Sequence, residues 1–299
     1  MDNWINTPFE FRFVNLKRQR PQTNLPLAIS GLTQQGVEHN LENQNNQDAT
    51  GIIVEEDFVA GIVCDGCSGT NDNLQDSISN NEFGAKLIVR LLTKIIQKTY
   101  NEKKLTDKDA FVQSVKTQLL SELKNIVDIV CDDNEADKEL FIHDFLMTTI
   151  YCVVADESRY IVFYCGDGVV GIDDMVEIID ESGKYLSSNL FKMCCPIRFE
   201  KADINEDLKI YFEGKLSEIK SIFLASDGFN EIVNGFKTQL VNFISIERMK
   251  NGFINIKPDF RGKILKDPSI SNEIGLKNWL KDDASFVLLK TIKPQEKES

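Results

Sequence analysis

Three Asp-Gly pairs, each at the end of an apolar run, are the residues of this chain best placed to do chemistry. They are Asp65-Gly66, Asp167-Gly168 and Asp227-Gly228. Apolar runs of this length predict buried strands. A carboxylate at the end of such a strand suits Mg²⁺ or Mn²⁺, because these hard ions take oxygen ligands and glycine lets the backbone approach them closely. One pair alone is typical of an ordinary turn, but the recurrence favours a shared site.

Two further acidic segments accompany these pairs. Asp48 lies in a polar stretch between two expected strands, and Asp282-Asp283 precedes the last one. The nearest basic residues, Lys86 and Lys281, are too few to pair with all of these acids. Buried carboxylates cost free energy unless they are paired or metal-bound, so the sequence predicts a metal site rather than a salt-bridge network. Ligation by oxygen alone selects Mg²⁺ or Mn²⁺ over zinc.

A pair of such ions would define the chemistry. Two neighbouring ions can share one water and lower its pKa toward neutrality, and they can bind phosphate oxygens and offset their charge. The residues by themselves therefore indicate a metal-assisted hydrolase, most simply a phosphatase.

Short strands must position these carboxylates. Apolar stretches joined by tight turns predict antiparallel sheet, with Glu55 to Asp57 as the turn of the first hairpin. The expected strands are residues 25–37, 51–64 (the hairpin), 145–154, 160–165, 169–172, 176–179, 208–212, 219–225 and 286–291.

Helical spacing of apolar residues separates these strands into groups. Amphipathic stripes predict helices that pack over a sheet. The expected helices are residues 83–96, 108–130, 227–249 and 273–280. Between these elements, residues 132–138 are predicted as an acidic loop and residues 180–189 as a hairpin or flexible segment.

Composition limits the domain count and the partners. The chain has 299 residues, 42% of them hydrophobic, and no repeat or linker divides it, so we expect one domain over residues 27–293. Residues 1–26 form an N-terminal extension and residues 294–299 a tail. The net charge of −13 disfavours nucleic acid. No apolar window reaches the roughly 18 residues of a membrane span.

The cysteines indicate a reducing compartment. There are seven, most of them in apolar runs, as expected of buried thiols in a cytosolic protein. Cys64 and Cys67 form a C-x-x-C pair, but no second pair supplies zinc ligands and the insert is not of the thioredoxin type. We expect a cytoplasmic monomer with no membrane or nucleic-acid partner.

Six short motifs occur in a set order over residues 28–291. They are Asn46-Gln47-Asp48, Val63-Cys64-Asp65-Gly66, Thr148-Thr149, Gly166-Asp167-Gly168, Ala225-Ser226-Asp227-Gly228 and Asp282-Asp283-Ala284-Ser285. This set resembles that of the metal-dependent protein phosphatases (PPM, type 2C), most of all the compact bacterial branch. The resemblance implies an α+β fold, a four-layer α-β-β-α sandwich of two antiparallel sheets flanked by helices. It also implies hydrolysis of phosphoserine and phosphothreonine by a water that bridges two Mn²⁺ or Mg²⁺ ions.

The same resemblance implies a role for each metal-site residue. Asp65 would bridge both ions, and the carbonyl of Gly66 would bind one of them. Asp227 and Asp282 would bind the other ion. Asp167 matches the acid that takes a third, weaker ion.

The residues around the substrate phosphate agree less well with the family. Asp48 matches the acid that holds metal-bound water, but Asn43 stands near the place where many members carry a phosphate-binding arginine. His39 is the nearby candidate for a phosphate contact, and Cys67 replaces a histidine that many members have after the Asp-Gly pair. Neither departure removes a metal ligand.

Three functions stay open at this point. The first is a serine/threonine phosphatase that acts on a phosphorylated protein, with a cognate kinase as a further partner. The second is a catalytically weak phosphatase-like domain that binds a phosphoprotein or a partner kinase, which the missing arginine favours. The third is another two-metal hydrolase acting on small phosphoesters or nucleotides, although no P-loop motif occurs.

Overall fold

Two antiparallel sheets of five strands each form the centre of the molecule. The computed structural model describes residues 25–34, 45–67, 80–230, 233 and 283–291. In spatial order, the first sheet contains β1 (Leu27–Gln34), β10 (Ala284–Thr291), β9 (Ser221–Ala225), β6 (Gly168–Ile172) and β7 (Met175–Ile179). The second contains β2 (Asp48–Val54), β3 (Phe58–Asp65), β4 (Ile150–Asp156), β5 (Arg159–Cys165) and β8 (Lys209–Lys215).

The sheets pack face to face because their strands alternate two apolar faces. In β3, Val59 and Val63 lie in the core between the sheets, while Ala60 and Ile62 face the helices. Successive side chains of a strand point to opposite faces, so one apolar strand can serve both layers. The expected hairpin of residues 51–64 is confirmed as β2 and β3, with its turn at residues 55–57.

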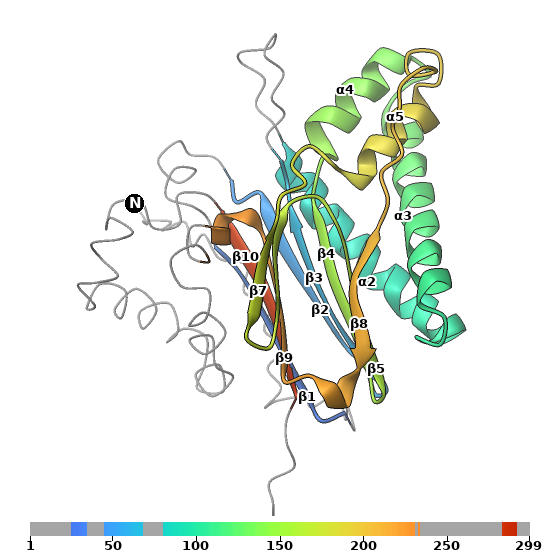
Figure 1. Ribbon diagram of the computed structural model, residues 1–299. Helices are drawn as coiled ribbons and strands as arrows, with labels where there is room; N and C mark the ends of the chain where they lie inside the picture. The colour runs from blue at the N-terminus through green and yellow to red at the C-terminus, as the bar shows by residue number, and fades with distance from the viewer. Residues whose placement is uncertain (1–24, 35–44, 68–79, 231–232, 234–282, 292–299) are drawn as a thin grey trace, which may run out of the picture.

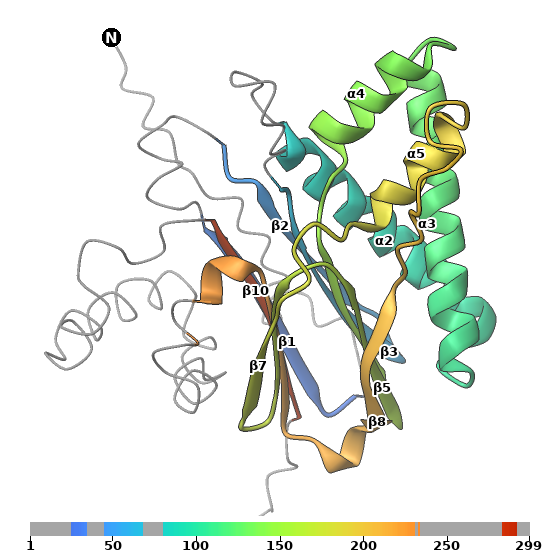
Figure 2. The same ribbon diagram turned by 45° about the horizontal axis from the view of Figure 1, so that its top comes forward.

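Two long helices cover the outer face of the second sheet. They are α2 (Asn81–Lys103) and α3 (Lys108–Val130), which lie side by side in Figures 1 and 2. Asp107 caps α3 by accepting a hydrogen bond from the amide of Ala110 at 2.9 Å. Phe111 and Leu119 are fully buried, and burial of such side chains stabilises the fold by about 1.5–3 kcal/mol each. Both predicted helices are confirmed, and α2 is longer than the apolar stripe indicated.

Two shorter helices were not predicted. The acidic loop expected at residues 132–138 is wrong, because α4 (Glu135–Phe145) begins within it. Asn134 caps this helix by accepting a hydrogen bond from the amide of Ala136 at 3.0 Å, and the acidic side chains of its first turn favour the helix dipole. The segment after β7 contains the 3₁₀ turn η1 (Leu186–Ser188) and α5 (Asn189–Cys194), which packs against α3 and α4.

The α+β class with two facing antiparallel sheets and a helical layer is thus confirmed. The helices predicted at residues 227–249 and 273–280 lie outside the described residues, apart from a short 3₁₀ turn, η3 (Asp227–Phe229). Among the helices that the structure describes, none is long and apolar enough to cross a membrane.

Candidate active site

Asp48 and Asp65 come together at one end of the sandwich. They are direct partners in the antiparallel register of β2 and β3, Asp48 as the first residue of its strand and Asp65 as the last of its own. Both occupy strand positions that face the first sheet, because they alternate with residues that face the helices. Asp48 is 1% exposed, whereas Asp65 is partly open to solvent. The structure therefore brings together two acids that the sequence placed in separate motifs.

The backbone of the first Asp-Gly pair is held by its neighbours on both sides. The carbonyl of Asp65 accepts hydrogen bonds from the amide of Thr149 at 2.8 Å and from the hydroxyl of Thr148 at 2.5 Å. The amide of Gly66 donates to the carbonyl of Gln47 at 3.2 Å. These bonds hold the turn rigidly and give Thr148 and Thr149, a motif of no obvious chemistry, a structural role.

The pair Asp227-Gly228 reaches the same site from the first sheet. Asp227 follows the end of β9 and opens η3, and Gly228 packs against the start of β10. A Cβ atom at Gly228 would lie 1.9 Å from the carbonyl oxygen of Asp283, so only glycine fits there. Asp283 is 2% exposed and its carboxylate accepts a hydrogen bond from the amide of Gln47 at 2.5 Å. This bond ties the two sheets together beside the site.

The electrostatics of this cluster are those of acids without enough positive charge. Burial raises the pKa of Asp48 from 3.8 to about 8, and the charges of Asp283 and Asp227 act in the same direction. Burial also raises the pKa of Asp65 well above its ordinary value, with further contributions from Asp48, Cys67 and Asp227. Because each acid responds to the charge of others, the carboxylates lie close together. A bound cation would relieve both the desolvation and the repulsion.

Buried oxygens without a hydrogen-bond partner also indicate a cation site. Within the described residues, three buried side-chain oxygens have no hydrogen-bond partner: Asp48 Oδ1, Ser285 Oγ and Asn230 Oδ1. All three belong to the strand ends and the turn that build this edge of the sheets. Buried polar atoms are normally hydrogen-bonded, so such a group of exceptions marks a place for an ion or ordered water. The oxygen-rich donor set fits a hard divalent cation.

Some of the predicted site residues lie outside the part of the chain that the structure describes. Asp282, a predicted ligand, lies outside the described residues. Within the described ranges, no three His, Cys, Asp or Glu side chains are arranged to hold a metal ion. His39 and Asn43 also lie outside them. The metal ligands therefore stay a prediction.

Asp167 occupies the neighbouring turn between β5 and β6. Gly166 has a φ of +100°, in the left-handed region that glycine favours, and its carbonyl accepts a hydrogen bond from the Tyr151 hydroxyl at 2.9 Å. Burial raises the pKa values of Asp167, Cys67 and Tyr185, and the charge of Asp167 adds a smaller increase to those of Cys67 and Tyr185. Asp167 thus lies on the Cys67 side of the site, as a separate acid beside the main cluster.

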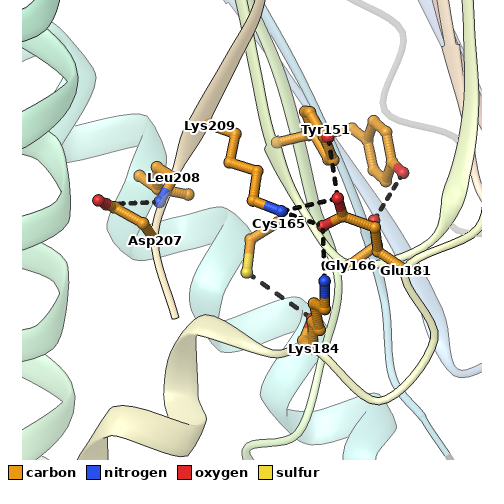
Figure 3. A network of polar contacts seen from close by, with 9 residues as sticks. Tyr151, Cys165, Gly166, Glu181, Lys184, Asp207, Leu208 and Lys209 are labelled. Carbon is orange, nitrogen blue, oxygen red and sulfur yellow. Dashed lines mark hydrogen bonds and ion pairs between the residues drawn. The ribbon is translucent and has the colours of Figure 1, made fainter. Parts of the chain in front are cut away.

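A polar network holds the segment that follows β7 against this turn. Figure 3 shows Glu181 in contact with Lys209 of β8, whose ammonium group lies 2.6 Å from both carboxylate oxygens. The Sγ of Cys165 lies 3.7 Å from the carbonyl oxygen of Lys184. These contacts link Glu181 and Lys184, near the two ends of residues 180–185, to the second sheet.

Tyr185 is a residue of this region that the sequence did not single out. It lies in the stretch predicted as a hairpin or flexible segment, directly before η1. Its hydroxyl lies beside the thiol of Cys67. Burial raises the pKa of that thiol, and the hydrogen bond with Tyr185 lowers it by less. No motif indicated this contact, because only folding brings residues 67 and 185 together. Cys67 stays protonated near neutral pH, as expected of a residue that is not a nucleophile.

Comparison with known families identifies the class. The family model described as protein phosphatase 2C matches residues 35–252. The chain belongs to this family, as the ordered motifs predicted, and the enzyme class is phosphoprotein phosphatase. A search of curated proteins finds no match to the chain.

Solved structures of bacterial phosphatases resemble this chain at low sequence identity. The serine/threonine phosphatase Stp1 from Staphylococcus aureus is 15% identical, with 91% of this chain and 98% of that chain covered and a TM-score of 0.47. PppA from Pseudomonas aeruginosa is 17% identical, with 88% and 97% covered and a TM-score of 0.47. The catalytic domain of PstP in complex with two manganese ions is 12% identical, with 89% and 99% covered and a TM-score of 0.44.

Proposed function

We propose that this chain is a Mn²⁺- or Mg²⁺-dependent serine/threonine protein phosphatase that hydrolyses phosphoserine and phosphothreonine directly, without a phosphorylated enzyme. The observation that carries the proposal is the pairing of Asp48 with Asp65 where β2 begins and β3 ends, close to Asp227. A pure binding module has no need of acids whose pKa values are raised by mutual repulsion and burial.

Four residues would hold two ions in this site. They are Asp65, the carbonyl of Gly66, Asp227 and Asp282, with Asp167 for a third, weaker ion. When bound, the ions supply a water of lowered pKa and offset the charge of the phosphate. Asp48 would accept a proton or hydrogen bond from the attacking water through its unpaired Oδ1. His39 stays the proposed phosphate contact.

Hydrolysis assays test this function directly. The substrates are p-nitrophenyl phosphate and a phosphothreonine peptide, each with Mn²⁺, with Mg²⁺ and with EDTA, for the parent and for Asp65→Asn. Metal-dependent release of phosphate that Asp65→Asn abolishes supports the phosphatase. Equal release in EDTA, or full activity of Asp65→Asn, would refute the mechanism.

One observation favours a second candidate function. No arginine occurs between Arg20 and Arg90, so the family's usual phosphate ligand is missing from the first motif. A phosphatase-like module that binds a phosphoprotein or partner kinase would tolerate this loss. Measurable Mn²⁺ binding without hydrolysis of either substrate would favour that module.

The remaining expectations form part of the same proposal. The substrate is a phosphorylated protein, and a cognate serine/threonine kinase is the partner to test first. A cytoplasmic monomer, and a single catalytic domain over residues 27–293, stay predictions from the sequence.

A further inference from the structure

Ser226 connects the two sheets at the candidate site. Its hydroxyl donates a hydrogen bond to Asp48 Oδ2 at 2.7 Å, and the two residues are 178 positions apart in the chain. Ser226 is fully buried and Asp48 is 1% exposed. Ser226 directly follows β9 of the first sheet, while Asp48 begins β2 in the second. This bond therefore crosses the interface between the sheets where the acids converge.

The surroundings of Ser226 determine where its hydroxyl proton points. The amide of Ser285 donates to Ser226 Oγ at 2.9 Å, and the amide of Ser226 donates to the carbonyl of Ser285 at 2.9 Å. Because one lone pair of the hydroxyl already accepts the Ser285 amide, its proton is directed to Asp48. A donor that also accepts a hydrogen bond is polarised, which strengthens its bond to the carboxylate.

The consequence for Asp48 is an assignment of its two oxygens. Oδ2 accepts the hydrogen bond from Ser226, and Oδ1 is the buried oxygen that no donor reaches, on a carboxylate that lies beside that of Asp65. A carboxylate held through one oxygen presents the other in a set direction. Ser226 also directly precedes Asp227, so one short segment both supplies an acid of the site and orients another.

We propose that Ser226 is a positioning residue, which orients Asp48 across the sheets so that Oδ1 faces the metal and substrate site. This inference rests on the proposed function for its catalytic consequence, but the bond itself can be tested without metal or substrate. Partners that orient metal-site residues typically contribute roughly 10–100-fold to metal affinity or activity.

The experiment compares Ser226→Ala with Ser221→Ala. Ser221 is a matched control, because it is also a buried serine, 4% exposed, and begins β9 at the end of the strand opposite to Ser226. Mn²⁺ affinity by calorimetry should fall roughly 10–100-fold in Ser226→Ala and change little in Ser221→Ala. The kcat for p-nitrophenyl phosphate should fall in the same variant with a smaller change in KM.

A double-mutant cycle with Asp48→Ala separates positioning from plain structural damage. If Ser226 acts through Asp48, then Ser226→Ala should have little further effect on Mn²⁺ affinity once Asp48 is removed. An equal effect in both backgrounds would show that Ser226 only supports the pairing of β9 and β10, and would overturn the inference. Asp48→Leu, which removes both oxygens and keeps a similar volume, replaces Asp48→Ala if that variant does not fold.

Two further outcomes distinguish this inference from the proposed function. If the parent binds Mn²⁺ but hydrolyses nothing, the proposed function fails while the affinity cycle still decides the role of Ser226. If the parent binds no Mn²⁺, the positioning role is overturned. Urea unfolding of the same four proteins in EDTA should still show coupling between Ser226 and Asp48, and additive effects there would refute the bond.

Discussion

Gly228 gives the sharpest test of the site geometry, because a single methyl group is sufficient to disturb it. A Cβ atom at this position would lie 1.9 Å from the carbonyl oxygen and 2.9 Å from the carbonyl carbon of Asp283. Ordinary contacts of a Cβ begin near 3.4 Å, so Gly228→Ala must move the two segments apart by about 1.5 Å. The atoms in the way belong to the backbone, which cannot rotate aside as a side chain can.

The expected loss follows from what this backbone carries. Asp283 accepts the hydrogen bond from Gln47, the residue before Asp48, so its displacement disturbs the acids of both sheets. Overpacking of this kind costs about 1–3 kcal/mol of stability. A misplacement of about 1 Å at a catalytic group costs roughly a hundredfold in rate, so we expect a comparable loss in kcat/KM and weaker Mn²⁺ binding.

A glycine of the first sheet, away from the site, serves as the control. Gly171 of β6 has its nearest obstacle, the Cβ of Phe223, at 3.2 Å, so Gly171→Ala requires a shift of only a few tenths of an ångström. Urea unfolding, Mn²⁺ calorimetry and phosphopeptide hydrolysis are measured for both variants. Gly228→Ala that binds Mn²⁺ as the parent does would refute the proposal that this turn builds the metal site.

Three other predictions test residues of the same site. Asp227→Asn should lose Mn²⁺ affinity and activity with little change in folding, and calorimetry showing equal affinity in variant and parent would remove this ligand from the assignment. Cys67→Ser should keep most activity, because burial raises the pKa of the thiol and attack by water needs no thiolate, whereas a kcat loss beyond about a hundredfold would reveal a chemical role. In EDTA, the parent should lose stability relative to Asp48→Asn as the pH rises from about 4 to about 8. The reason is that the pKa of Asp48 is raised to about 8 in the folded state, so the folded protein binds more protons than the unfolded chain over this range. Added Mn²⁺ should reverse that loss, because it competes with protons for the carboxylates. Thermal melts in which Tm changes with pH equally in the parent and in Asp48→Asn would contradict the raised pKa.

Local pattern was sufficient for the strands and the long helices of the described residues and failed for the short helices. The hairpin of β2 and β3 was predicted from apolar runs around a polar turn, and the helix α3 from its apolar stripe, because both signals are local. The helix α4 was missed because its acidic first turn has the composition of a loop. Its stability depends on the Asn134 cap and on burial of Ile142, and the burial is a tertiary contact.

The sequence by itself determined the chemical type of the site. Repeated Asp-Gly pairs at the ends of apolar runs indicated oxygen ligands for a hard cation, and the ordered motifs indicated the family, which the comparison confirmed. The family inference succeeds because a strand end and a glycine turn are local features that a short stretch of chain encodes, while the metal ligands stay a prediction.

Only the tertiary structure decided how the acids act together. It pairs Asp48 with Asp65 in one register, leaves Oδ1 of Asp48 unpaired and commits Oδ2 to Ser226. It also raises the pKa values of the two acids by burial. Periodicity could not reveal these facts, because desolvation and hydrogen bonding depend on the distance between the sheets, and that distance is set by core packing of residues far apart in the chain.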